Sequence, residues 1–237
     1  MFKERLKRLL LGGGEFPSSP AAKPGEGPPS TARGPAGVEA LPAYSRHSHG
    51  FEQFSSQIQG CENLWILDFS GAVQENVSFV TGLGHRLYSL DVLRTLDVTF
   101  ESSGDDPYGL QSNPEKIRQF LDENLNFENE FFDGALLWNT LEFLAPPLLE
   151  ATVDRLYQVL KPGSCLLAFF HADEKAATAS TYTYRIADPK TLLVTPRGQR
   201  QIALHFNNRA IEKLFGRYRS VKFFLARDKL REVIITK

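Results

Sequence analysis

Two acidic residues, Asp68 and Asp91, are the strongest candidates for ligand binding in this sequence. Asp68 ends a short apolar run and Asp91 ends a second strand-like run, and Asp91 follows Asp68 by roughly 20 residues, the separation at which a nucleotide-binding fold places its ribose-binding carboxylate. A carboxylate accepts two hydroxyl hydrogen bonds at once, which suits the diol of a ribose. The structural alternatives are that Asp91 is a strand-end carboxylate that caps a loop and that Asp68 is a turn-forming residue.

Histidines occur at two places where a metal or a proton could be bound. His47 and His49 form a His-x-His pair whose obvious acidic neighbour is Glu52. Because a metal site needs more partners than this, we predict a solvated or locally packed pair and no metal site. His171 follows an apolar run. It could serve as a base for an acceptor or as a metal ligand, but we predict a polar residue at a strand end.

The composition argues against several classes of protein. The 27 basic and 28 acidic side chains give a net charge of −1, which gives no support to a dedicated nucleic-acid binder. Two cysteines, Cys61 and Cys165, cannot form a disulfide scaffold or a cysteine-based zinc site, so we predict one surface thiol and one buried thiol. No run of about 18 apolar residues is present, so we expect no transmembrane segment and predict a cytoplasmic protein.

The candidate ligand residues lie among alternating strand and helix patterns. Strands are predicted at Leu64–Asp68, in the run that ends at Asp91, at Phe132–Leu137 and at Ser164–Phe170. Helices are predicted from Val73 to Gly82, from Pro114 (with Asn113 as cap) and from Pro146 to Leu160. Near-continuous apolar strands separated by helices are typical of a parallel sheet that is covered on both faces.

After Phe170 the pattern changes to antiparallel strands. They are predicted at Tyr182–Ile186, Thr191–Thr195 and Gln201–Phe206, joined by turns at Asp188-Pro189 and Pro196–Gly198. Asn207 is expected to cap a helix, and the closing segments VKFFLA and REVIITK to form an antiparallel hairpin, because no crossover helix fits between them. The predicted fold is α/β: a doubly wound, mostly parallel, Rossmann-like sheet with a C-terminal antiparallel hairpin strand and a β-ribbon insertion.

In order and spacing, the chain from about Leu64 to Lys237 resembles a class I S-adenosylmethionine-dependent methyltransferase. The segment FFDGALLWNTLEFL is similar to the fourth-strand segment of that family, and PPLLEATVDRLYQVLKPGSCLLAFF to its helix, Leu-Lys-Pro-Gly turn and fifth strand. The closing VKFFLARDKLREVIITK is similar to the reversed terminal hairpin of the family. The resemblance implies S-adenosylmethionine as cofactor and methyl transfer as the reaction.

The resemblance also implies a set of cofactor-binding residues. Asp91 would bind the ribose, and the turn Ser70–Ala72 would lie under the methionine part with its backbone amides facing the ligand. Asn124 would contact the adenine amino group, and Asn139 the methionine group or the acceptor. Together the implied residues are Asp68, Ser70, Gly71, Ala72, Asp91, Asn124 and Asn139.

The glycine motif of the family is degenerate in this chain. The pattern is G-x-G-x-G, and those positions, registered on Asp68, are Ser70, Ala72 and Gln74 here, with Gly71 one place off. Glycine is used there because the backbone approaches the ligand closely and adopts positive φ without steric cost. This departure favours the alternative that the domain is a non-catalytic methyltransferase-like scaffold or binding module that has lost cofactor binding.

The predicted ribbon is expected over the carboxyl edge of the sheet, where doubly wound folds bind their ligands. Tyr182, Tyr184 and Arg185 would then wall a pocket for the methyl acceptor, or the aromatic rings would simply cover apolar surface. The acceptor, a small molecule or a macromolecule, is not identified by the sequence. No strong general base is visible, which is compatible with catalysis by alignment of donor and acceptor.

The N-terminal part of the chain has a different composition. Residues 1–11 form a short basic amphipathic segment, which would be either a frayed terminus or a helix making weak contact with a membrane surface or a protein. Residues 12–42 hold seven of the 14 prolines and seven of the 18 glycines, so we predict a disordered linker there. The methyltransferase-like domain would then comprise residues 43–237.

Overall fold

The computed structural model describes residues 42–100, 108–173, 175–224 and 230–237. The predictions for residues 1–11 and 12–42 therefore fall, apart from Pro42, outside the described residues. Within the described part of the chain, no helix combines the length and the apolar character needed to cross a membrane. The cytoplasmic location stays a prediction.

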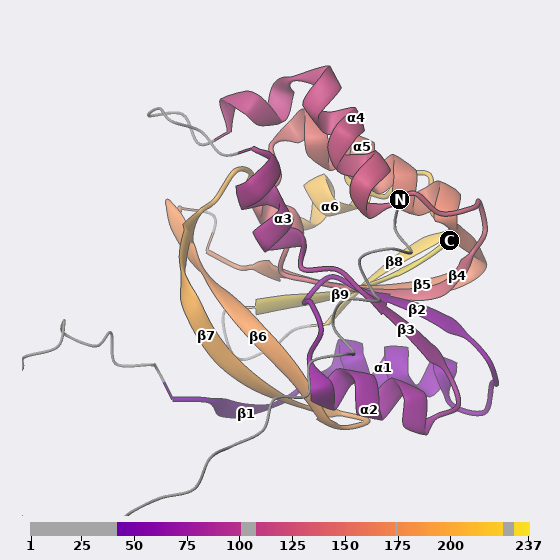
Figure 1. Ribbon diagram of the computed structural model, residues 1–237. Helices are drawn as coiled ribbons and strands as arrows, with labels where there is room; N and C mark the ends of the chain where they lie inside the picture. Colours follow the sequence, from indigo (N-terminus) through magenta and orange to yellow (C-terminus); the bar gives the residue numbers. More distant parts are fainter. Residues whose placement is uncertain (1–41, 101–107, 174, 225–229) are drawn as a thin grey trace, which may run out of the picture. The chain divides into compact units, whose positions relative to one another are not determined.

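A six-stranded sheet with the strand order β3-β2-β4-β5-β9-β8 forms the centre of the described fold (Figure 1). Its strands are β2 (Trp65–Asp68), β3 (Arg86–Ser89), β4 (Phe132–Trp138), β5 (Leu160–His171), β8 (Ser220–Phe224) and β9 (Leu230–Thr236). Strands β3, β2, β4 and β5 are parallel to one another, whereas β9 is antiparallel to both β5 and β8. The predicted α/β fold with a mostly parallel sheet and a reversed C-terminal strand is confirmed.

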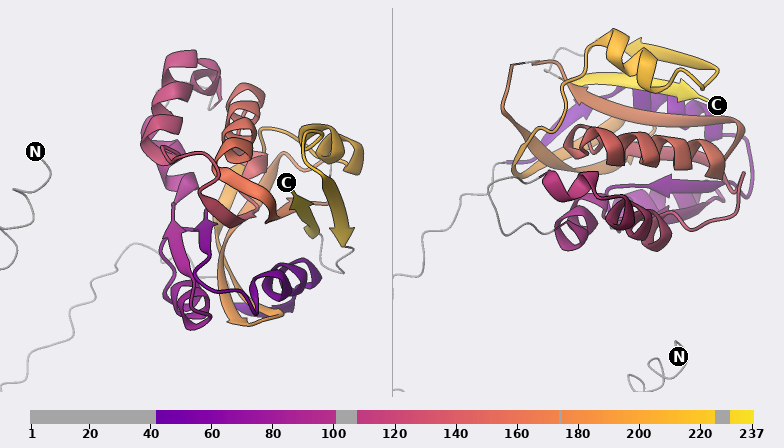
Figure 2. Two further views of the ribbon diagram at one scale, coloured as in Figure 1. Left: turned by 90° about the vertical axis from the view of Figure 1, so that its right-hand side faces the viewer. Right: turned by 90° about the horizontal axis from the view of Figure 1, so that it is seen from above.

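Helices cover both faces of this sheet, as Figures 1 and 2 show. One face carries α1 (His49–Ile58) and α2 (Gln74–Gly82), and the other carries α3 (Val92–Thr99), α4 (Pro114–Asn124), α5 (Pro146–Val159) and α6 (Asn208–Leu214). Successive strand residues point to opposite faces. Thus Ile66 and Leu136 belong to the apolar cluster on the α1 side, and Leu67 and Leu137 to the cluster on the α5 side.

Local signals determine where several helices begin. The Oδ1 atom of Asn113 accepts hydrogen bonds from the N–H groups of Glu115 and Lys116, and Pro114 occupies the first position of α4. Asn207 caps α6 as predicted. The sequence patterns do not predict α1 or α3, which are short and begin within three residues of the end of a strand.

A second sheet, antiparallel and three-stranded, has the order β1-β7-β6 and confirms the predicted ribbon. Its strands are β1 (Tyr44–His47), β6 (Thr178–Asp188) and β7 (Thr191–Gln201). The strand predicted at Gln201–Phe206 is wrong, because β7 ends at Gln201 and the third strand of the ribbon comes from the N-terminal side of the domain. The apolar side chains of β6 and β7 pack in the same cluster as those of α1 and α2.

The turn predicted at Pro196–Gly198 is also wrong, because these residues lie within β7. Thr181 pairs with Gly198 and Tyr182 with Pro196, so Arg197 is the extra residue of a β-bulge. Proline is accepted at such a position because a bulge interrupts the hydrogen-bond ladder. A bulge bends its strand and redirects the extra side chain.

The strand order reverses at β2. From β2 the chain passes to β3 on one side and then to β4 on the other. In doubly wound sheets, ligands bind at such a reversal, outside the carboxyl ends of the strands. The segments that follow β2 and β3 therefore border the expected binding region.

Candidate functional site

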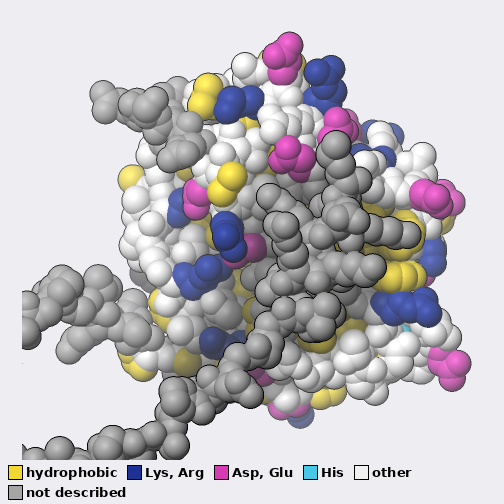
Figure 3. Space-filling view, in the orientation of Figure 1, with side chains coloured by type: hydrophobic (Ala, Val, Ile, Leu, Met, Phe, Trp, Pro, Cys, Tyr) yellow, Lys and Arg dark blue, Asp and Glu magenta, His cyan; other side chains and the backbone are white. Residues whose placement is uncertain are grey.

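A polar cleft of about 550 Å³ opens where β2 and β3 end. Its size lies within the range of small-molecule sites, roughly 300–1,000 Å³. Of the predicted site residues, those that line it are Ser70, Gly71, Ala72, Asp91 and Arg185. The lining also includes Glu75, Arg94, Thr183 and Arg197, which the sequence analysis does not identify. Figure 3 shows basic side chains beside acidic ones on the surface near α3 and the β6–β7 ribbon.

Asp68, at the end of β2, is fully buried and is not part of the cleft lining. Its Oδ1 accepts hydrogen bonds from Trp138 Nε1 at 2.6 Å and from the N–H and hydroxyl of Ser70 at 2.9 and 2.8 Å. Its Oδ2 accepts a hydrogen bond from Asn76 Nδ2 at 3.1 Å. Burial raises the pKa of this carboxyl group, and the hydrogen bonds from Ser70, Trp138 and Asn76 act in the opposite direction. Asp68 thus ties the turn after β2 to β4 and α2.

In the turn after β2, the backbone amides of Ser70 and Gly71 donate hydrogen bonds to acceptors within the protein. The Ser70 N–H donates to Asp68, and the Gly71 N–H donates to the carbonyl oxygen of Leu90 at 2.9 Å. An isolated antiparallel bridge joins Ser70 to Asp91. The expectation that the amides of Ser70 and Gly71 face a ligand is therefore wrong, because the turn is bonded directly to the segment that follows β3.

Gly71 and Asp91 lie against each other at the cleft. Gly71 has a φ of +81°, and a Cβ atom at this position would lie 3.2 Å from Asp91 Cβ. Both features favour glycine. The Oδ1 atom of Asp91 accepts a hydrogen bond from the Arg94 N–H at 3.1 Å and so caps α3. Oδ2 lies 3.8 Å from Arg197 Nη1, and 30% of the Asp91 side chain is exposed. Asp91 therefore has two roles: it caps a helix and it lines the cleft.

The ribbon supplies the opposite wall of the cleft. Arg185, on β6, donates from Nη1 to Thr195 Oγ1 at 2.8 Å, and its Nε lies 3.5 Å from Glu75 Oε1 in the first turn of α2. Arg197 reaches the cleft from the β-bulge in β7. A proline-arginine-glycine sequence is an ordinary turn signal, so only the pairing of β7 with β6 reveals this position.

Two residues that were predicted to bind the cofactor form hydrogen bonds outside the cleft. Asn124 lies buried at the end of α4, where its Nδ2 donates to the carbonyl oxygen of Phe120 at 2.7 Å, and it does not line the cleft. Asn139 follows β4, is almost fully buried and donates from Nδ2 to the carbonyl oxygen of Ser180 at 3.0 Å. The structure therefore does not bring these two amides to the cleft.

The two tyrosines that were predicted to wall the pocket for the methyl acceptor differ in burial. Tyr184 is fully buried and stacks on Trp138 with ring centroids 4.8 Å apart. Burial also raises the pKa of its hydroxyl well above the usual value. Tyr184 therefore cannot wall an open pocket, and its ring belongs to the core beneath the ribbon. Tyr182 is half-buried and lies beside the imidazole of His171, with ring centroids 6.2 Å apart.

His171, at the end of β5, is paired with a buried acidic residue. Its Nδ1 lies 2.6 Å from Glu142 Oε2, and its backbone N–H donates to Glu142 Oε1 at 2.8 Å. Neither residue lines the cleft beside Asp91. His171 is thus a strand-end polar residue, as predicted, held by a partner that the sequence analysis does not identify.

The similarity of this chain to known proteins lies in structure and not in sequence. No family model and no curated protein matches the chain. The chain is similar to 1,6-didemethyltoxoflavin-N1-methyltransferase of Burkholderia thailandensis at 11% identity, with 80% of this chain and 78% of that chain covered and a TM-score of 0.43. It is also similar to S-adenosylmethionine-dependent methyltransferases of Methanosarcina mazei (15% identity, 75% and 93% covered, TM-score 0.41) and of Archaeoglobus fulgidus (12% identity, 79% and 94% covered, TM-score 0.43).

Likeness at this level assigns neither a family nor an activity to the chain. The identities lie between 11 and 15%, and the TM-scores are below 0.5.

Proposed function

We propose that this domain binds S-adenosylmethionine in the cleft and transfers its methyl group to an acceptor. The observation that supports the proposal is the position of Asp91, a partly exposed carboxylate beside a side-chain-free Gly71 at the strand-order reversal. This is where a doubly wound sheet binds a nucleoside, and a carboxylate there can accept both hydroxyl groups of a ribose.

The charged groups of the cleft fit the remaining parts of such a ligand. Asp91 would hold the ribose. The negative charge of Glu75 would complement the ammonium group of the ligand. The positive charges of Arg94, Arg185 and Arg197 would complement its carboxylate. The bound cofactor would supply a methyl group activated by a sulfonium. The residues of the cleft would bind and orient the donor, so that an acceptor, either a small molecule or a macromolecule, meets the methyl group in line.

The direct test is calorimetric titration of the full chain with S-adenosylhomocysteine. The key variant is Asp91→Asn, because asparagine is also a good helix cap and so preserves the start of α3 while removing the charge. We expect at least a tenfold weaker affinity, since a hydrogen bond to a charged group is worth about 1.5–3 kcal/mol. Asp122→Ala, which removes an exposed carboxylate from α4, is the matched control and should bind like the wild type.

A wild-type protein that binds no adenosylhomocysteine at millimolar concentration would contradict the proposal. So would an Asp91→Asn variant with unchanged affinity. If binding is found, incubation with an isotopically labelled methyl donor and candidate acceptors tests transfer itself.

A second candidate function is favoured by the hydrogen bonding of the turn. Because the amides of Ser70 and Gly71 are both used within the protein, the turn offers a ligand less than a glycine-rich loop would. The domain would then be a non-catalytic scaffold or binding module with a retained methyltransferase-like architecture. The same titration separates the two functions, because only the first requires affinity for adenosylhomocysteine.

A further inference from the structure

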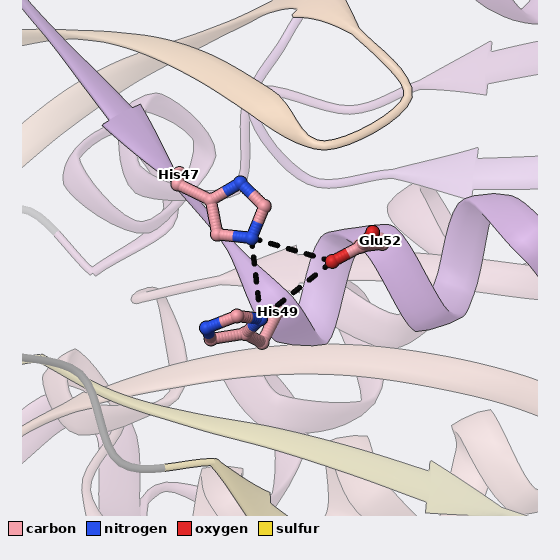
Figure 4. Close-up of side chains that lie close together, drawn as sticks. All are labelled: His47, His49 and Glu52. Carbon is pink, nitrogen blue, oxygen red and sulfur yellow. Dashed lines mark hydrogen bonds and ion pairs between the residues drawn. The ribbon is translucent and has the colours of Figure 1, made fainter.

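Three side chains with metal-binding atoms converge where β1 passes into α1. His47 is the last residue of β1, His49 is the first residue of α1, and Glu52 lies one turn further along the helix. His47 Nε2 lies 3.2 Å from His49 Nδ1 and 3.3 Å from Glu52 Oε2, and His49 Nδ1 lies 3.6 Å from the same oxygen. Figure 4 shows the three donor atoms as the corners of a small triangle.

The size of this triangle matches one face of a tetrahedral zinc site. Zinc binds imidazole nitrogen at about 2.0–2.1 Å and carboxylate oxygen at about 2.0–2.2 Å, so two ligands of a tetrahedron lie about 3.3–3.5 Å apart. The three measured separations, 3.2, 3.3 and 3.6 Å, agree with that value to a few tenths of an ångström. The three donor atoms are therefore spaced as one zinc ion requires.

Buried interactions hold the backbone that carries these side chains. Ser48, between the two histidines, accepts the Phe51 N–H as the cap of α1, and its hydroxyl donates to Glu232 Oε2 at 3.0 Å. Glu232 is itself buried, accepts the Gly50 N–H and forms an ion pair with Arg46. The backbone positions of both histidines are thus determined before any ion arrives, which lowers the entropic cost of binding.

The chemistry of the three donors favours a particular class of ion. Two imidazoles and one carboxylate suit zinc and its neighbours among the transition metals, whereas calcium and magnesium prefer oxygen ligands alone. The side chains of His47, His49 and Glu52 are 43, 60 and 49% exposed, so an ion can enter from solvent and keep water as its fourth ligand.

We propose that His47, His49 and Glu52 form a binding site for one zinc ion, which joins the end of β1 to the first turn of α1. The sequence predicts no metal here, because the spacing alone does not reveal that the three donor atoms meet. The site is separate from the cleft beside Asp91, and none of its residues lines that cleft. The proposed site does not depend on the proposed methyl transfer.

The test is a calorimetric zinc titration of the untagged full chain after treatment with a chelator. We expect one zinc ion per chain. His47→Ala, His49→Ala and Glu52→Gln should each weaken the affinity at least tenfold, because each removes one of three protein ligands. All three side chains are exposed, so the variants should retain the wild-type circular dichroism spectrum. His205→Ala removes an exposed histidine outside the triangle and serves as the control with unchanged affinity.

Two further readouts test the geometry and the link. Cobalt added in place of zinc should give the intense visible absorption of a tetrahedral site in the wild type and lose it in the His47→Ala/His49→Ala double variant. Zinc should raise the Tm of the wild type and leave that of the double variant unchanged. No zinc binding at 1 mM, or equal affinity in the wild type and the double variant, would overturn the proposal. Neither readout involves adenosylmethionine, so failure here is distinguishable from failure of the proposed function.

Discussion

Replacement of Asp68 by alanine should destabilise the domain strongly, although the residue lies outside the cleft. The substitution removes the acceptor of Trp138 Nε1, which is almost fully buried, and one of the acceptors of Asn76 Nδ2, which keeps the carbonyl oxygen of Tyr184 at 3.1 Å. A buried donor without an acceptor costs about 1–3 kcal/mol, so the loss at Trp138 should lower the free energy of unfolding by about that amount. Ser70 is partly exposed and can hydrogen-bond to water instead, so it adds little to this loss.

Asp68→Asn removes the charge but keeps the shape of the side chain. Asparagine keeps one acceptor oxygen but turns a second donor towards Asn76, whose own Oδ1 already accepts the Ile186 N–H. The variant should therefore lose about 1–3 kcal/mol through one unsatisfied buried donor.

The penalty of Asp68→Asn should also depend on pH. Because burial raises the folded-state pKa of Asp68 above the ordinary value of 3.8, the folded protein binds this proton more tightly than the unfolded chain. The associated stability is fully present below about pH 3.8 and is lost as the pH rises through the folded-state pKa. Asparagine does not titrate. The stability difference between the wild type and Asp68→Asn should therefore shrink as the pH rises.

Urea denaturation followed by tryptophan fluorescence and circular dichroism measures these differences at several pH values between 4 and 8. Asp122→Ala is the control, since loss of an exposed carboxylate should change the unfolding free energy by less than about 0.5 kcal/mol. A loss below about 1 kcal/mol for Asp68→Ala would refute the role assigned to this carboxylate. A difference between the wild type and Asp68→Asn that grows with pH would refute the sign of the pKa shift.

Two further predictions follow from the backbone and the thiols. Gly71→Ala should lower the unfolding free energy by about 1–2 kcal/mol, because alanine is strained at a φ of +81° and its Cβ would crowd Asp91. Gly60 has a φ of +79° but no atom near the position of a Cβ, so Gly60→Ala measures the backbone strain alone. Denaturation curves should show a smaller loss of stability for Gly60→Ala than for Gly71→Ala. Burial raises the pKa of Cys165 to about 12, so mass spectrometry after thiol alkylation at pH 8 should find only Cys61 modified in the folded protein and both thiols modified in urea.

Local signals in the sequence were sufficient for the central architecture. The strands of the parallel sheet are short apolar runs, and the helix start at Pro114 depends on a cap and a proline that act within one turn. The C-terminal hairpin is antiparallel because too few residues separate its strands for a crossover. Asp91 and Gly71 could be assigned to one edge because the carboxyl ends of parallel strands meet there, and Arg185 because the ribbon was expected over that edge.

Only the tertiary structure decided which polar groups remain free at that edge. Asp68 ends β2 and Asp91 follows β3, yet Asp68 is buried against Trp138 and Asn76, whereas Asp91 remains at the cleft. The bulge at Arg197 and the triangle that involves His47 depend in the same way on contacts between distant segments. The sequence does not reveal such outcomes, because the hydrogen-bond partner of a buried polar group is selected by packing across the whole fold rather than by its neighbours in the chain.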